Sequence, residues 1–208
     1  YGMNLSKSMA YKAALSGANV VSGGALGIDA AAHEGAIEAG GSTIAVLGCG
    51  INTNYLISNS FLRSKIAKSG VLISEYPPDY PPFACNFPKR NRIISGLSDA
   101  TVVVEAGKKS GSLITANLAN NQNRDVLVAP IDLRSPLSEG IISLINDGVK
   151  VVVDMEDLVK SYEHKLKNKL PSISIKRPAF SSLHEKKPKL KENVSPEVPE
   201  NISKNAKK

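Results

Sequence analysis

The sequence predicts an α/β protein with a Rossmann-like, doubly wound and mainly parallel sheet that is covered by helices on both faces. Short runs rich in β-branched residues alternate with helical segments along most of the chain. Each run is nearly all apolar, as is typical of parallel strands that are buried on both faces. Loops rich in Gly, Ser or Lys follow two of these runs, at the strand ends where such folds bind ligands.

The expected strands lie at residues 19–21, 43–47, 71–74, 100–104 and 125–129, with a weaker one at 150–153. The expected helices lie around them, at residues 3–16, 28–39, 60–69, 91–97, 113–121 and 138–147. Gly17, Gly40 and Gly70 come just after three of these helices, where a left-handed cap is common. This order is the βαβ rhythm of a doubly wound sheet.

The positive charge of the chain is concentrated at its C-terminal end. The net charge is +7, yet residues 1–159 carry −1, because residues 160–208 hold 13 Lys and Arg against 5 Asp and Glu. Residues 163–208 are rich in Lys, Pro and Ser without a sustained period, which predicts a disordered basic tail after a folded domain of residues 1–162. Nucleic-acid binding by the folded part must therefore depend on a local cluster of cations.

Composition argues against several other classes of protein. Cys49 and Cys85 have neither metal-site nor disulfide-framework spacing, so a reducing cytoplasm is expected. No apolar stretch is long enough to cross a membrane, and the N-terminal residues do not resemble a signal peptide. We expect no metal, no cofactor and no catalytic residue, because no Ser/His/Asp set or His/Cys cluster converges on the loops.

A glycine-rich turn is the first candidate ligand site. Ser22, Gly23 and Gly24 follow an expected strand and precede a helix, where free N–H groups favour an anion. The spacing is not that of the dinucleotide fingerprint, and a tight turn with Asp29 near the helix start explains it about as well. His33, on the same helix face as Asp29, is expected to have a structural role.

A lysine- and serine-rich loop is the second candidate. Lys109, Ser110, Gly111 and Ser112 lie between a strand and a helix but lack the order of a nucleotide-hydrolysing phosphate loop. Cations, hydroxyl groups and a helix N-terminus together suit phosphate binding. The alternative is a solvated basic loop.

The third candidate is a cationic segment with aromatic neighbours. Lys89, Arg90, Asn91 and Arg92 lie near the start of a helix, and arginine suits bidentate phosphate contacts and base stacking. The nearby aromatic residues are Tyr76, Tyr80, Phe83 and Phe87. They could stack on bases or pack the Pro-rich loop onto the domain, and packing is favoured for Tyr80 and Phe83. Glu75 and Glu105 end strands nearby and could act as an acid or base, or pair with one of the arginines.

The chain resembles the DprA/Smf (DNA-processing protein A) family in the order, spacing and identity of several segments: VVSGGALGIDAAAHEGAIEAGGSTIAVLGCG, GVLISEYPPDYPP, NFPKRNRIISGLSDATVVVEAGKKSGSLITANLA and PLSEGIISLINDGVKVV. The resemblance covers roughly residues 1–153. It implies binding of single-stranded DNA, protection of incoming strands, and loading of the RecA recombinase during natural transformation in competent cells. It also implies a homodimer. The family's DNA site would map onto the three candidate segments above.

Two departures from the family pattern matter. The family has a central strand, ending in Gly-x-Arg, that would lie upstream of Tyr1. The family's C-terminal winged-helix domain is not recognisable in residues 163–208. We therefore expect a fragment whose first strand is missing.

Two other functions remain open. The fold is similar to that of the LOG phosphoribohydrolases, which cleave nucleoside monophosphates, but Ile114 and Thr115 stand where that family has glutamates. A module that binds nucleic acid only through its basic tail is the other alternative.

Overall fold

The chain folds into alternating helices and strands, and the α/β class with parallel strands is confirmed. The computed structural model describes residues 1–53, 55, 60–132 and 134–167, all within the unit Tyr1–Leu170. The strands are β1 (Val20–Ser22), β2 (Thr43–Leu47), β3 (Val71–Ser74), β4 (Ala100–Val103), β5 (Asp125–Val128) and β6 (Lys150–Val151). The helices are α1 (Gly2–Leu15), α2 (Ile28–Glu38), α3 (Ser60–Ser69), α4 (Asn86–Leu97), α5 (Gly111–Asn121), the 3₁₀ turn η2 (Pro136–Ser138), α6 (Glu139–Asn146) and α7 (Met155–Lys167).

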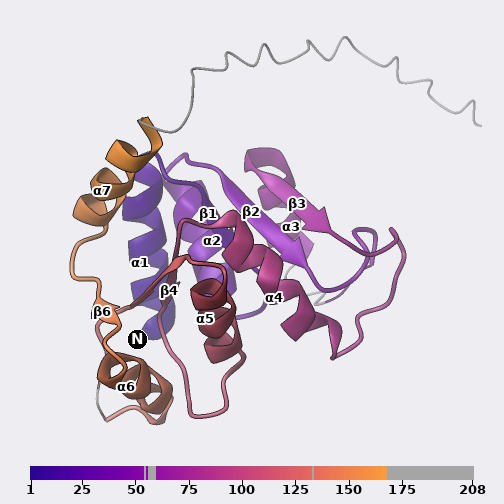
Figure 1. Ribbon diagram of the computed structural model, residues 1–208. Coiled ribbons are helices and arrows are strands. Elements are labelled where there is room, and N and C mark those ends of the chain that lie inside the picture. The colour runs from indigo at the N-terminus through magenta and orange to yellow at the C-terminus, as the bar shows by residue number, and fades with distance from the viewer. Residues whose placement is uncertain (54, 56–59, 133, 168–208) are drawn as a thin grey trace, which may run out of the picture. The chain divides into compact units, whose positions relative to one another are not determined.

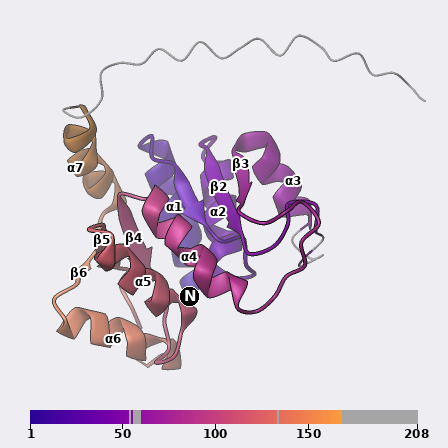
Figure 2. The same ribbon diagram turned by 45° about the vertical axis from the view of Figure 1, so that its right-hand side comes forward.

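The strands form two parallel three-stranded sheets where the sequence predicts one continuous sheet (Figures 1 and 2). The first sheet has the order β1-β2-β3, with Val21 beside Ile44. The second has the order β4-β5-β6. Within the described residues, β1 and β4 are therefore edge strands. Thr101 on β4 has a buried hydroxyl oxygen with no hydrogen-bond partner in this part of the chain.

Helices cover both faces of each sheet, which confirms the doubly wound arrangement. Alternate residues of a strand point to opposite faces, and on β4 Val103 packs in a cluster with Ala116 of α5 and Ile141 of α6. Val104, directly after β4, packs in a separate cluster with Met9 of α1. In the first sheet, α2 and α3 pack against β2, and α4 also lies against it. Figures 1 and 2 both show α4 beside α5.

Two helices differ clearly from the prediction, while the bounds of the other elements agree to within two residues. Helix α4 begins at Asn86 and so includes Pro88 in its first turn, where a proline is tolerated because its missing N–H has no partner within the helix. Helix α7 was not expected at all, and it runs past residue 162, where we expected the folded part to end. The disorder predicted for the rest of the tail concerns residues 168–208, which lie outside the described residues.

The three glycines after helices have two different roles. Gly17 and Gly40 have φ values of +88° and +71°, as predicted for left-handed caps. Gly70 is not among the residues with positive φ. It is needed for a close approach, since a Cβ atom there would lie 1.9 Å from the carbonyl oxygen of Thr43.

Candidate nucleic-acid interface

The glycine-rich turn lies at the carboxyl end of β1, as predicted, and leads into α2. Gly24 has a φ of +71°, which favours glycine. The N–H of Ala25 donates to Oδ2 of Asp29, at 3.2 Å, so the aspartate closes the turn. A Cβ atom at Gly23 would lie 2.6 Å from Nη2 of Arg90. The turn is therefore built around the arginine as well as around its own aspartate.

Arg90 is a buried cation that ties this turn to the end of β2. Arg90 is only 5% exposed to solvent. Nη1 donates to the carbonyl oxygen of Gly23, at 2.8 Å, and to that of Val46, while Nε donates to Oδ1 of Asn91, at 3.2 Å. Burial lowers the pKa of the guanidinium and the nearby Asp29 raises it. In this structure Arg90 and Asn91 thus hold main chain in place.

Arg92, two residues further along and on the exposed side of α4, forms an ion pair with Glu75 at the end of β3. Both side chains are about half exposed. This contact realises one of the alternatives that the sequence left open for Glu75. Lys89 is exposed on the same helix. The predicted cationic segment therefore contains one buried, one paired and one solvent-facing cation.

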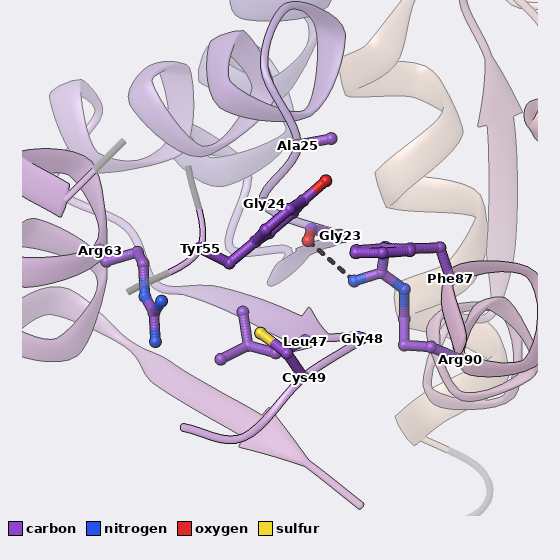
Figure 3. Close-up of a pocket in the computed structure, with 10 residues that line it drawn as sticks. All are labelled: Gly23, Gly24, Ala25, Leu47, Gly48, Cys49, Tyr55, Arg63, Phe87 and Arg90. Atoms are coloured by element: carbon purple, nitrogen blue, oxygen red, sulfur yellow. Dashed lines mark hydrogen bonds between the residues drawn. The ribbon is translucent and has the colours of Figure 1, made fainter. Parts of the chain in front are cut away.

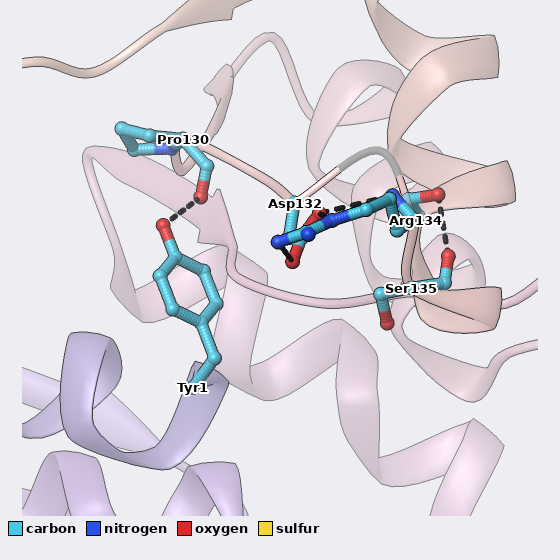
Figure 4. A network of polar contacts seen from close by, with 6 residues as sticks. Tyr1, Pro130, Asp132, Arg134 and Ser135 are labelled. Carbon is cyan, nitrogen blue, oxygen red and sulfur yellow. Dashed lines mark hydrogen bonds and ion pairs between the residues drawn. The ribbon is translucent and has the colours of Figure 1, made fainter.

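Glu105 has a different partner from the one considered for it. The N–H of Gly2, at the start of α1, donates to Oε1 of Glu105 at 3.1 Å. A carboxylate at a helix N-terminus is stabilised there by the helix dipole. Close by, the hydroxyl of Tyr1 donates to the carbonyl oxygen of Pro130, at 3.0 Å, and Arg134 forms an ion pair with Asp132 (Figure 4).

The lysine- and serine-rich loop lies between β4 and α5, as predicted. The hydroxyl of Ser110 accepts the N–H of Ser112, at 3.3 Å, and so caps α5. The hydroxyl of Ser112 donates to the carbonyl oxygen of Glu105, at 3.4 Å, which fixes the loop to the end of β4. Lys108 and Lys109 are exposed, and no ion pair among the described residues involves either of them. Their charges stand beside the positive end of the α5 dipole.

A pocket of about 60 Å³ opens beside the glycine-rich turn. Figure 3 shows Arg63 and Arg90 on opposite sides, with Tyr55 and Cys49 between them. The lining residues are Gly23, Gly24, Ala25, Leu47, Gly48, Cys49, Tyr55, Arg63, Phe87 and Arg90.

The pocket brings together part of the predicted site and adds residues that sequence reasoning missed. Gly23, Gly24 and Arg90 line it, as does Phe87. Lys109 to Ser112 do not, so the predicted residues form two groups at the carboxyl ends of different strands. Arg63 was not predicted, because a lone arginine within a polar helix carries no sequence signal.

The other predicted aromatic residues pack on one another, as favoured for Tyr80 and Phe83. The rings of Tyr76 and Tyr80 are stacked with centroids 5.0 Å apart, and Phe83 meets Tyr80 edge-on at 5.7 Å. Phe87 is separate from this group and contacts the ring of Tyr55, at 5.1 Å. Of the four, it is therefore Phe87 that faces the pocket.

His33 has the structural role that was expected, with an unexpected partner. It is completely buried, and Nδ1 lies 2.7 Å from Oγ1 of Thr43. That hydroxyl donates its proton to the carbonyl oxygen of Val20, at 2.7 Å, so Nδ1 carries the proton of the ring. Burial lowers the pKa of His33 to about 4. The neutral imidazole thus joins α2 to the first sheet.

Neither a metal site nor a membrane span is apparent in the part of the chain that the structure describes. No group of three or more His, Cys, Asp or Glu side chains there could hold a metal ion. None of the described helices is long and apolar enough to cross a bilayer.

Comparison with known proteins identifies close relatives. The profile of the family described as DNA recombination-mediator protein A matches residues 1–163. Protein Smf of Escherichia coli is 42% identical over 167 residues, which are 80% of this chain and 45% of that protein. The chain thus spans less than half of this curated relative.

Two solved structures have the same fold. DNA processing protein A from Streptococcus pneumoniae superimposes with a TM-score of 0.71 and 38% identity, covering 76% of this chain and 56% of that one. DNA processing protein A from Helicobacter pylori, whose structure is described for its single-stranded DNA binding mode, gives a TM-score of 0.70 and 30% identity. That match covers 79% of this chain and 75% of the other.

Proposed function

Since the chain belongs to the DNA recombination-mediator protein A (DprA/Smf) family, we propose that it binds single-stranded DNA during natural transformation. In this proposal it protects incoming strands in the cytoplasm of competent cells and loads the RecA recombinase onto them. A homodimer places two sites side by side along one strand. The protein binds and positions DNA and catalyses no reaction.

The observation that carries the proposal is the pair of exposed lysines at the start of α5. Lys108 and Lys109 have no carboxylate partner among the described residues. Both lie in the loop after β4, directly before the N-terminus of α5. A helix N-terminus with adjacent cations is a ready site for phosphate. The single-stranded DNA binding mode described for the Helicobacter pylori protein, which shares this fold, supports a strand as the ligand.

The proposed contacts divide between the two groups of site residues. Phosphates bind at Lys109 and at the main chain of Ser110, Gly111 and Ser112. Lys89 supplies a further exposed cation on α4. The turn at Ser22, Gly23 and Gly24 lies at the carboxyl end of β1, and the pocket beside this turn faces the bound DNA.

Preference for single strands over duplex tests this proposal. Fluorescence anisotropy with labelled strands and duplexes of equal length, measured across a salt series, gives both affinities. We expect tighter binding of the single strand, and a logarithm of affinity that falls linearly with the logarithm of salt concentration. Equal or tighter binding of duplex contradicts the proposal.

A nucleoside monophosphate phosphoribohydrolase is the alternative function. Such an enzyme needs carboxylates where Ile114 and Thr115 stand on α5, and Ile114 is solvent-exposed there. Incubation with nucleoside monophosphates should release no free base. Turnover that disappears in Glu75→Ala or Glu105→Ala would favour the enzyme.

A further inference from the structure

The first two turns of α3 carry an exposed aromatic ring and a cation that lie outside the three candidate segments. Resting on the proposed function, we infer that a bound single strand continues onto these turns, where one base stacks on Phe61 and a neighbouring phosphate binds Lys65. The helix begins after the loop that follows β2 and ends just before β3. Its first turns therefore lie toward the carboxyl ends of the strands, as does the lysine- and serine-rich loop after β4.

The ring and the cation form a pair on the surface of the helix. Phe61 is 71% exposed, so most of its ring surface is free to stack on a base. The Nζ atom of Lys65 lies 4.5 Å from the centroid of this ring, one helical turn away. Proteins that bind single strands without sequence preference combine exposed aromatic rings for the bases with cations for the phosphates. The pair offers both groups side by side.

The surrounding sequence makes this surface positive although the folded unit is not. Residues 39–74 contain Arg63, Lys65 and Lys68 and no Asp or Glu, whereas residues 1–159 as a whole carry −1. None of these three cations forms an ion pair with another described residue. A lone exposed phenylalanine would need no explanation. One that is held beside uncompensated cations favours an anionic ligand with flat rings, which is a nucleic acid strand.

A groove connects this surface to the rest of the candidate interface. It has a volume of about 280 Å³, and no carboxylate is among its lining residues, which include Thr53, Ser60, Arg63 and Ser64. Ser60 and Ser64 directly precede Phe61 and Lys65, so the groove runs along the adjoining side of the same two turns.

Arg63 is the residue that the groove shares with the pocket beside the glycine-rich turn, and Figure 3 shows it on the α3 side of that pocket. It donates from Nη1 to the carbonyl oxygen of Thr53 at 2.6 Å and from Nη2 to that of Ile51 at 2.7 Å. These bonds hold the side chain in place and use only part of its five N–H donors. Hydroxyl groups and a guanidinium are suited to a sugar–phosphate backbone. A strand that passes the pocket can therefore follow the groove to Phe61.

A tryptophan in place of Phe61 provides a local test. The chain contains no tryptophan, so Phe61→Trp gives the 208-residue chain a single indole at the proposed contact. Oligothymidylate of about 20 nucleotides, longer than a typical single-strand site, should quench the indole emission as it binds, because a base stacks on the ring. A base-free sugar–phosphate strand of equal length should leave the emission nearly unchanged. The signal is local, so binding by the basic tail does not produce it.

Tyr11→Trp is the matched control. Tyr11 is also an exposed aromatic residue of a helix, but it lies near the end of α1, which leads to the amino end of β1. Its indole emission should not change with either strand. Equal quenching in the two variants overturns the inference, because the strand would then contact rings anywhere on the surface.

Two further variants test the ring and the cation through affinity. Phe61→Ala should weaken binding of the same oligothymidylate about fivefold or more, the effect of one lost base–aromatic contact, whereas Tyr11→Ala should not. Lys65→Ala should reduce the slope of log affinity against log salt by about 0.7, one phosphate contact of a single strand. Lys68→Ala, at the other end of α3, should leave that slope unchanged.

The outcomes separate this inference from the proposed function. If strands bind but Phe61→Ala keeps full affinity and Phe61→Trp shows no quenching, the inference is wrong and the proposed function stands. Quenching by the base-free strand as strong as that by oligothymidylate overturns base stacking as well, and equal slope changes for Lys65→Ala and Lys68→Ala overturn the phosphate contact. Failure of every single strand to bind contradicts the proposed function itself.

Discussion

At the scale of single residues, the cations of the candidate interface differ in what they are free to do. Lys109 is exposed and without an ion pair among the described residues. Arg92 is engaged with Glu75, and Arg90 is buried against main chain. The sequence treats the three alike, but their environments assign them different roles. Substitutions at these positions should therefore divide into effects on binding and effects on stability.

Lys109→Ala should weaken binding of single-stranded DNA by about 1–2 kcal/mol, because one or two charge-assisted phosphate contacts are lost. The free energy of unfolding should hardly change, since the side chain is exposed. Anisotropy titrations at fixed salt measure the effect. Lys68→Ala is the matched control. Lys68 is also exposed, but it lies in the last turn of α3, which leads into the amino end of β3 and not to the carboxyl ends of the strands. Equal losses in both variants would mean that only net charge matters.

Arg90→Ala should lower the free energy of unfolding by about 3 kcal/mol, because it leaves the carbonyl oxygens of Gly23 and Val46 buried without a donor. Arg92→Ala removes only a half-exposed ion pair and should cost less than about 1 kcal/mol. Urea unfolding compares the two. A larger loss for Arg92→Ala would contradict the assignment of Arg90 as the structural cation.

His33 makes stability depend on pH. Burial, aided by Arg90 and opposed by Asp29, lowers its pKa from 6.5 to about 4 in the folded chain. The unfolded chain therefore binds a proton between these values that the folded chain does not. Stability from His33 is complete above pH 6.5 and falls by about 3 kcal/mol in total as the pH drops to 4.

Urea unfolding between pH 7 and pH 4 measures this loss. His33→Asn retains a donor near the position of Nδ1 but does not titrate, so its stability should fall less steeply over the same range. Parallel curves for the two proteins would show that His33 does not contribute.

The places of many candidate residues could be predicted at this scale, although their chemistry left a tight turn and a solvated basic loop open as alternatives. The positions of Ser22 to Gly24 and of Lys109 to Ser112 at strand ends follow from the βαβ pattern alone. Arg63 could not be predicted, because it reaches the pocket only through the tertiary packing of α3. Nor does the sequence distinguish a buried arginine from an exposed one.

At the scale of elements, the topology suggests why the strands form two separate sheets. Helix α1 packs against α2, so a right-handed βαβ crossover through α1 would place its preceding strand next to β1, on the side away from β2. That edge of β1 and the edge of β4 are unpaired in the described residues. We propose that a strand upstream of Tyr1 joins the two sheets, as the family resemblance leads us to expect.

Hydrogen exchange tests this proposal in a longer form of the protein that continues upstream of Tyr1. Amide protons of β1 and β4 should exchange more slowly there than in the 208-residue chain, because the new strand would bond to both edges. The protection of β2 and β5, which are central in their sheets, should change least. Unchanged exchange at β1 and β4 would show that the two sheets remain separate.

Helix α7 shows why an element can be missed and how it could have been found. Its segment is rich in charged residues and runs into the basic tail, so no element was predicted for it. Asp154, however, accepts the N–H groups of Glu156 and Asp157 at 2.8 and 3.4 Å, which is an N-cap arrangement. Met155 and Leu158 then pack against the core cluster of the second sheet. An aspartate before spaced apolar residues was the available signal.

At the scale of the whole molecule, the question is which part of the chain binds DNA. Residues 1–159 carry −1 and residues 160–208 carry +8. The tail must therefore add affinity that is non-specific and strongly screened by salt. The folded unit can contribute only through groups that are placed to meet a strand, such as Lys109 and the pocket.

The most direct test compares the full chain with a chain truncated after Leu170, which keeps α7 intact, each with and without Lys109→Ala. Binding of single-stranded oligonucleotides is measured by anisotropy across a salt series. We expect the truncated chain to keep binding single strands with a shallower salt dependence, and Lys109→Ala to weaken both chains. If truncation abolishes binding and Lys109→Ala has no effect in the full chain, the tail is the DNA-binding element and the site assigned to the folded unit is wrong.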